Sequence, residues 1–135
     1  MSYNEKNLTA NFSRYLKLHP TLLSNSAAIE FKVIKGHTCN FKSHVRPHQI
    51  PSLLKAKHLS IYHKISDLGC MLAPSPFDSF YLTKADAFLA ILYFKTRKPK
   101  ILYFISINTV LSFQLIKNKI TEADAKTYCD FSITL

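Results

Sequence analysis

Apolar residues recur along the chain with two spacings, one typical of helices and one typical of strands. Leu8, Phe12 and Leu16 follow one another at intervals of four, which predicts an N-terminal helix with one apolar face, and Pro20 marks its end. Residues 27–35 alternate between apolar and polar side chains instead. This alternation predicts a strand whose two sides have different surroundings.

The remaining pattern predicts a helix over 47–57, strands over 59–65, 77–82, 87–94 and 100–107, a helix capped by Asn108, a short helix capped at Thr121, and a C-terminal strand. The strands 77–82 and 87–94 are separated by four residues, so we expect them to form a hairpin. Residues 37–46 are expected to be a polar connection. This order of elements favours an α/β fold with a mixed central sheet flanked by helices, in a single domain over residues 1–135.

Charge is distributed unevenly along this pattern. The 135 residues contain 18 Lys and Arg but 8 Asp and Glu, a formal net charge of +10. Residues 1–64 carry +8 of this excess and residues 65–135 carry +2. An apolar fraction of 47% and a content of 2 Gly exclude a disordered basic tail. We therefore expect a folded basic domain that binds a polyanion mainly through its first half.

The apolar segments, the N-terminus and the cysteines indicate in which compartment the protein is expected. The longest apolar runs, 87–94 and 101–111, are shorter than the roughly 18 residues of a membrane-spanning helix, so no membrane partner is expected. The polar N-terminus lacks the apolar core of a secretory signal, which favours a cytoplasmic protein. Cys39, Cys70 and Cys129 show no CxxC spacing, which argues for reduced thiols rather than disulfides or a zinc site.

The most informative segment is the strand that contains Glu30 and Lys32. These residues are two apart, so their side chains point to the same side of the strand. One interpretation is a solvent-facing ion pair on an edge strand. The other is chemical: Glu30 binds a divalent cation through its hard oxygens, while Lys32 positions an attacking water or offsets charge on a phosphate.

The residues that follow favour the chemical interpretation. Glu30-Phe31-Lys32 is followed by a basic loop, by Pro47-His48-Gln49-Ile50 at the start of a helix, and by an apolar strand. This succession, from Glu30 to Ile65, resembles the PD-(D/E)XK nuclease superfamily and, within it, the RecU-type Holliday junction resolvases. The resemblance implies a restriction-endonuclease-like fold, metal-dependent hydrolysis of DNA with Mg²⁺ or Mn²⁺, branched DNA as the substrate, and a homodimer with two active sites.

The same resemblance implies roles for individual residues. Glu30 and Lys32 match the acid and the lysine of the catalytic strand, and Gln49 matches a helix glutamine that this family directs toward its active site. His48 precedes Gln49 and is expected to contact phosphate or to be a surface residue, rather than to bind a metal. The alternative for Gln49 is an exposed residue at a helix N-terminus.

One departure from the family pattern concerns the second metal ligand. The family places an Asp on the strand before the Glu-x-Lys strand, but residues 6–29 contain no Asp or Glu. Asp78, in Pro76-Phe77-Asp78, resembles the family's Pro-Asp element in a later position. If the hairpin over 77–94 takes the place of the missing strands, Asp78 neighbours Glu30 and completes the metal site. Glu5 is another candidate donor, and both Asp78 and the weaker candidate Asp67 are alternatively turn residues.

Basic side chains concentrate around the Glu-x-Lys strand and are the candidate DNA contacts: Lys35, Lys42, Arg46, His48, Lys55 and Lys57. The sequence therefore predicts a metal-dependent, structure-specific endonuclease of the junction-resolving type. Two alternatives remain open. One is a catalytically silent relative that only binds DNA, and the other is a repair or restriction-type nuclease that cuts duplex or flapped DNA.

Overall fold

The computed structural model describes residues 4–18, 27–59, 61–64, 79–82 and 85–135. In chain order the elements are α1 (Glu5–Leu18), β1 (Ala27–Ile34), β2 (Thr38–Asn40), α2 (Phe41–His44), α3 (Gln49–His58), β3 (Ile61–Lys64), β4 (Ser79–Leu82), β5 (Asp86–Tyr93), β6 (Ile101–Ser106), α4 (Ile107–Ile116), β7 (Lys119–Thr121), α5 (Glu122–Tyr128) and β8 (Phe131–Thr134).

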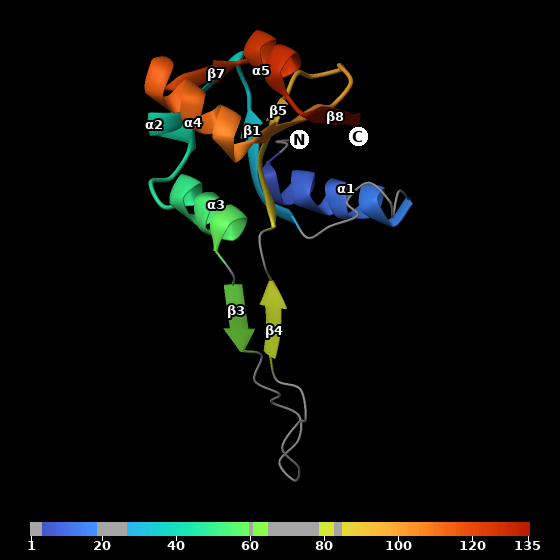
Figure 1. Ribbon diagram of the computed structural model, residues 1–135. Coiled ribbons are helices and arrows are strands. Elements are labelled where there is room, and N and C mark those ends of the chain that lie inside the picture. Colours follow the sequence, from blue (N-terminus) through green and yellow to red (C-terminus); the bar gives the residue numbers. More distant parts are fainter. Residues whose placement is uncertain (1–3, 19–26, 60, 65–78, 83–84) are drawn as a thin grey trace.

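A mixed four-stranded sheet forms the centre of the fold, with strand order β1-β5-β6-β8. β1 and β5 are parallel and are connected through α3, whereas β5, β6 and β8 pair in antiparallel fashion. α1 covers one face of this sheet, and α3 and α4 cover the other (Figure 1). The predicted α/β fold with a mixed central sheet flanked by helices is confirmed.

The inner position of β5 follows from its composition. Leu89 and Ile91 point into the core beneath α3 and α4, while Ala90 and Leu92 point into the core beneath α1. A strand that is buried on both faces reads as a continuous apolar run rather than an alternation. β1 keeps its alternation because, among the described strands, it lies at the edge of the sheet.

Aromatic and aliphatic side chains fill the two cores. On the α1 side, Leu8 and Phe12 pack against Phe104, whose ring stacks on Phe131 with 4.4 Å between centroids. On the other side, α3 contributes Ile50 and Leu53, with further apolar residues from α4. The four-residue spacing of the first helix is thus explained, because its apolar face is the face that covers the sheet.

The predicted hairpin between residues 77–82 and 87–94 is wrong. β4 pairs with β3 in a separate two-stranded ladder, which Figure 1 shows extending away from α3. β5 has no edge left for β4, because β1 occupies one edge and β6 the other. The rearranged hairpin beside β1 is therefore not formed by these strands.

Smaller differences concern short elements and helix caps. The expected connection over 37–46 contains β2, which pairs with β7, and α2. The predicted cap at Asn108 is wrong, because α4 begins at Ile107 and Asn108 lies in its first turn. Ser106 is the N-cap instead, and its hydroxyl lies 3.1 Å from that of Thr109. The Thr121 cap is confirmed, and its side chain and that of Asp124 form a reciprocal capping box.

Candidate functional site

β1 carries the two residues of the Glu-x-Lys motif on one face. Glu30 and Lys32 lie between Ala28 and Ile34, on the side of β1 that α3 covers. Because β1 is the edge strand of the described sheet, side chains on this face can also be reached from the N-terminal end of α1. The strand thus brings the motif to a place where two helices meet the sheet edge.

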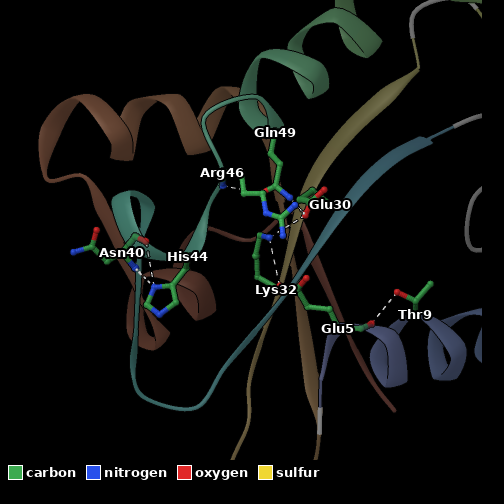
Figure 2. A network of polar contacts seen from close by, with 8 residues as sticks. All are labelled: Glu5, Thr9, Glu30, Lys32, Asn40, His44, Arg46 and Gln49. Atoms are coloured by element: carbon green, nitrogen blue, oxygen red, sulfur yellow. Dashed lines mark hydrogen bonds and ion pairs between the residues drawn. The ribbon is translucent and has the colours of Figure 1, made fainter.

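Lys32 is the centre of the site. It is 4% exposed and is the buried charged residue of the described part of the chain. Its Nζ lies 3.0 Å from Oε1 of Glu30 and 3.4 Å from Oε1 of Glu5, which is the first residue of α1 (Figure 2). A buried ammonium group needs such partners because desolvation is costly for an unpaired charge. Glu5 and Glu30 therefore share one buried cation.

Gln49 connects this cluster to α3. As the first residue of that helix, it donates a hydrogen bond from Nε2 to Oε1 of Glu30. Its own Oε1 accepts a hydrogen bond of 2.8 Å from the backbone N–H of Arg46, so that the orientation of the amide is defined at both ends (Figure 2). Glu30 is therefore held by an amide on one side and by an ammonium group on the other.

The contacts on Glu30 leave one of its oxygens available. Both Gln49 and Lys32 contact Oε1, and no hydrogen bond within the described residues engages Oε2. Two carboxylates around one ammonium group give the cluster an excess of one negative charge. Such an excess favours the binding of a cation, and oxygen donors of this type suit Mg²⁺ or Mn²⁺.

The number of protein donors is consistent with this ion chemistry. Within the part of the chain that the structure describes, no group of three or more His, Cys, Asp or Glu side chains is arranged as a metal site. Mg²⁺ in phosphate-transfer sites commonly uses one or two carboxylates and completes its shell with water and phosphate oxygens. Glu30 and Glu5 can supply these two carboxylates.

Asp78 and Asp67 both lie outside the described residues. The hairpin that would have placed Asp78 beside Glu30 is not formed, because β4 pairs with β3. A role for Asp78 in metal binding remains a prediction, whereas the structure brings Glu5 directly to the cluster.

A cysteine near the cluster does not add a ligand. Cys39 is fully buried, and burial raises the pKa of its thiol to about 11, although the positive charge of Lys32 acts in the opposite direction. The thiol is therefore protonated at neutral pH. A neutral thiol is neither a good nucleophile nor a good metal ligand, so Cys39 is a core residue.

The predicted DNA-contacting residues do not form one patch. Lys42 and Arg46 line a common groove beside the first turn of α3, and His48 precedes that helix. Lys55 and Lys57 belong to its last turn, and Lys35 follows the end of β1. All except Lys57 are exposed. The structure thus brings Lys42 and Arg46 together at one groove, of which Arg46 also contacts Gln49 through its backbone N–H. The other four are distributed along α3 and the end of β1.

Sequence reasoning missed a second charge cluster. Oε2 of Glu122 lies 2.6 Å from Nζ of Lys95 and 2.9 Å from Nδ1 of His37. The hydrogen bond from Lys95, followed by that from His37, lowers the pKa of Glu122 despite its partial burial. The one signal in the sequence was the capping box at Thr121, which places Glu122 at the start of α5 but does not indicate its partners.

Comparisons with known proteins give no information on the Glu30 cluster. No protein-family model matches the chain, and no curated protein or solved structure is significantly similar to it. Among the described residues, no helix is long and apolar enough to cross a membrane. The groups gathered at the edge of β1 are a fixed carboxylate, a second carboxylate and a buried lysine, which together can bind a cation and a phosphate.

Proposed function

We propose that this protein is a metal-dependent, structure-specific DNA endonuclease that resolves Holliday junctions. The observation that carries the proposal is the shared ammonium group of Lys32, which lies within 3.4 Å of Glu5 and 3.0 Å of Glu30 while Gln49 orients Glu30. Ordinary surface ion pairs do not require a buried lysine or a second carboxylate. The site thus matches the roles that the RecU-type resemblance implies for Glu30, Lys32 and Gln49.

Glu30 and Glu5 are the proposed ligands of Mg²⁺ or Mn²⁺. The ion, when bound, would polarise the phosphate and the attacking water. Gln49 and Lys32 both contact Oε1 of Glu30, so Oε2 is the oxygen that would be available to bind the ion. Burial fixes the position of the Lys32 side chain. Its ammonium group can position water or stabilise negative charge on the phosphate.

DNA is the proposed substrate because of the charge around this site. The chain has a formal net charge of +10. Exposed Lys42 lies on α2, and exposed Arg46 and His48 lie in the loop that leads from α2 to Gln49. Positive side chains bind the phosphate backbone irrespective of sequence. Symmetric cutting of a four-way junction needs two active sites related by a two-fold axis, so a homodimer is part of the proposal.

The test is cleavage of a four-way DNA junction in Mg²⁺ by wild type and by Glu30→Gln. We expect wild type to introduce symmetric nicks and Glu30→Gln to lose at least about a hundredfold in rate while its affinity for the junction is unchanged. Glu122→Gln is the matched control, because it also replaces a lysine-paired glutamate by its amide. It should cut like wild type.

Normal cutting by Glu30→Gln would show that the cluster is not the active site. Parallel reactions on flapped and on linear duplex DNA identify the substrate. Preferential cutting of either one would make the protein a repair or restriction-type nuclease instead of a resolvase.

One observation favours a second function, a catalytically silent protein that binds junctions. Within the described residues the cluster has two carboxylates, and both already contact Lys32. An ion pair of this kind can persist in a relative that has lost its metal. A wild-type protein that shifts the junction in a gel but leaves it intact in Mg²⁺ and in Mn²⁺ would support this function over cleavage.

A further inference from the structure

A groove of about 550 Å³ lies beside the first turn of α3, between α2, α3 and α4. The backbone N–H of Phe41 donates to the carbonyl of Asn118, which fixes the start of α2 against the residue that follows the end of α4. Asn118 follows the C-cap residue of α4 and has a left-handed backbone conformation, with φ of 52°. The groove is thus an open one, bordered by helices that a backbone hydrogen bond connects to one another.

The lining of the groove combines apolar walls with a basic rim. Its walls and rim are formed by Phe41, Lys42, Val45, Arg46, Pro47, Ile50, Pro51, Leu54, Leu111, Gln114 and Asn118. Two of these residues are basic and none is acidic. Two others are amides, which can both donate and accept hydrogen bonds. The size is in the range of pockets that hold small organic ligands.

The positive charge of the rim favours some ligands of the groove over others. A second copy of this chain also carries +10, so that the basic rim would repel it. A ligand with a flat apolar body, hydrogen-bonding edges and an attached anion matches all three parts of the lining. A nucleotide has these properties, but only when its base is unstacked, because a paired duplex keeps its base faces inside.

The groove and the Glu30 cluster share one helical turn. Gln49 contacts Glu30, whereas the next residue, Ile50, lines the groove. Arg46 lines the groove too, and its backbone N–H holds the amide of Gln49. A nucleotide bound in the groove would therefore lie next to a phosphate bound at the cluster.

We propose that the groove between α2, α3 and α4 binds one unpaired base of the DNA beside the phosphate at the Glu30 cluster, with Lys42 and Arg46 contacting the adjoining backbone. This inference rests on the proposed function in that DNA is the ligand. It adds a substrate feature, because branched or bulged DNA offers unstacked bases whereas a continuous duplex does not.

The test compares the affinities of a short DNA duplex with one unpaired thymine and of the same duplex fully paired, by fluorescence anisotropy in EDTA. Wild type should bind the bulged duplex about tenfold more tightly, a ratio typical of one base stacked on a protein surface. Leu111→Glu places a carboxylate in the groove and should abolish this preference while retaining affinity for the paired duplex. Gln114→Glu, an exposed isosteric change in the same lining, should also reduce the ratio even if Leu111→Glu fails to fold.

Leu115→Glu is the matched control. It introduces the same charge into α4 at a residue that is 87% exposed and does not line the groove, so that it should keep the tenfold preference. Equal affinities of wild type for the two duplexes, or an unchanged preference in both Leu111→Glu and Gln114→Glu, would overturn the proposal. Binding of an acidic peptide that Leu111→Glu abolishes, without any bulge preference, would assign the groove to a protein partner instead.

Base binding in the groove and cleavage at the Glu30 cluster are measured independently of each other. The anisotropy measurement contains no metal and does not depend on cleavage. Cleavage of junctions without a preference for the bulged duplex would contradict base binding in the groove but not the nuclease function. A preference for the bulged duplex without any cleavage would contradict the nuclease function but not base binding in the groove.

Discussion

Two clusters in this molecule pair glutamate with basic side chains in opposite proportions. At the edge of β1, two carboxylates, Glu5 and Glu30, share the one ammonium group of Lys32. At the start of α5, one carboxylate, Glu122, is shared by Lys95 and His37. In the first cluster the two carboxylates exceed the single ammonium group by one negative charge. In the second cluster the ammonium group of Lys95 balances the single carboxylate. The difference separates a site that suits an added cation from one that is satisfied by the protein itself.

The position of the second cluster explains its composition. His37 follows the end of β1, Lys95 follows β5, and the backbone N–H of Glu122 donates to the carbonyl of His37 at 2.8 Å. Glu122 therefore joins α5 to the ends of two parallel strands. Stabilisation of the fold accounts for this cluster, whereas it does not account for the extra carboxylate at Lys32.

The largest expected effect is that of Lys32→Met on stability. Removing the buried ammonium group leaves two carboxylates with no cation between them, so we expect the free energy of unfolding to fall by about 2 kcal/mol at neutral pH. Urea denaturation measures this loss. The variant should also be inactive in the junction assay, because it lacks the lysine that is proposed to act on the phosphate.

Lys95→Met is the comparison for that experiment, since it removes the lysine of the other cluster. The Lys95 side chain is 38% exposed and Glu122 keeps His37 as a partner, so the expected loss is below about 1 kcal/mol. Equal losses for the two variants would contradict the distinction between the clusters.

Local patterns in the sequence predicted the elements better than their pairing. The alternation of residues 27–35 placed Glu30 and Lys32 on one face of a strand, as observed in β1. The apolar run over 87–94 fits both a hairpin strand and an inner parallel strand, so the run alone did not identify β1 as its partner. Partner choice depends on which edges are free in the assembled sheet, and that information is not local.

The same limit applies to the candidate site. The resemblance predicted that Gln49 points toward the active site, and the structure shows its amide donating a hydrogen bond to Glu30, whereas its role stays a prediction. The approach of Glu5 to Lys32 joins residues 27 positions apart, which no spacing rule for a helix or a strand describes. The groove likewise combines α2 and α3 with α4, whose Leu111 and Gln114 are far from the basic loop in sequence.

A smaller effect is expected from Mg²⁺, and it tests the excess charge directly. An ion that binds only the folded protein stabilises it by about 1.4 kcal/mol at ten times its dissociation constant. We expect Mg²⁺ to raise the unfolding temperature of wild type and of Glu122→Gln, but not that of Glu30→Gln. Glu5→Gln and Asp78→Asn then identify the second donor, because only the variant that removes a ligand should weaken the response. A full response in Glu30→Gln would place the ion elsewhere.

The smallest effect concerns the pH dependence of Glu122→Gln. The hydrogen bond from Lys95 lowers the pKa of Glu122 in the folded protein below its ordinary value of 4.5. The resulting stabilisation is complete above that ordinary value and is lost as the pH falls through the lower pKa of the folded state. Wild type should therefore exceed Glu122→Gln by up to about 1 kcal/mol at neutral pH. Thermal unfolding should show this advantage disappear in strong acid, where Glu122 is neutral too. An advantage that persists there would mean that Glu122 acts through packing, and the contrast with the Glu30 cluster would no longer be one of charge.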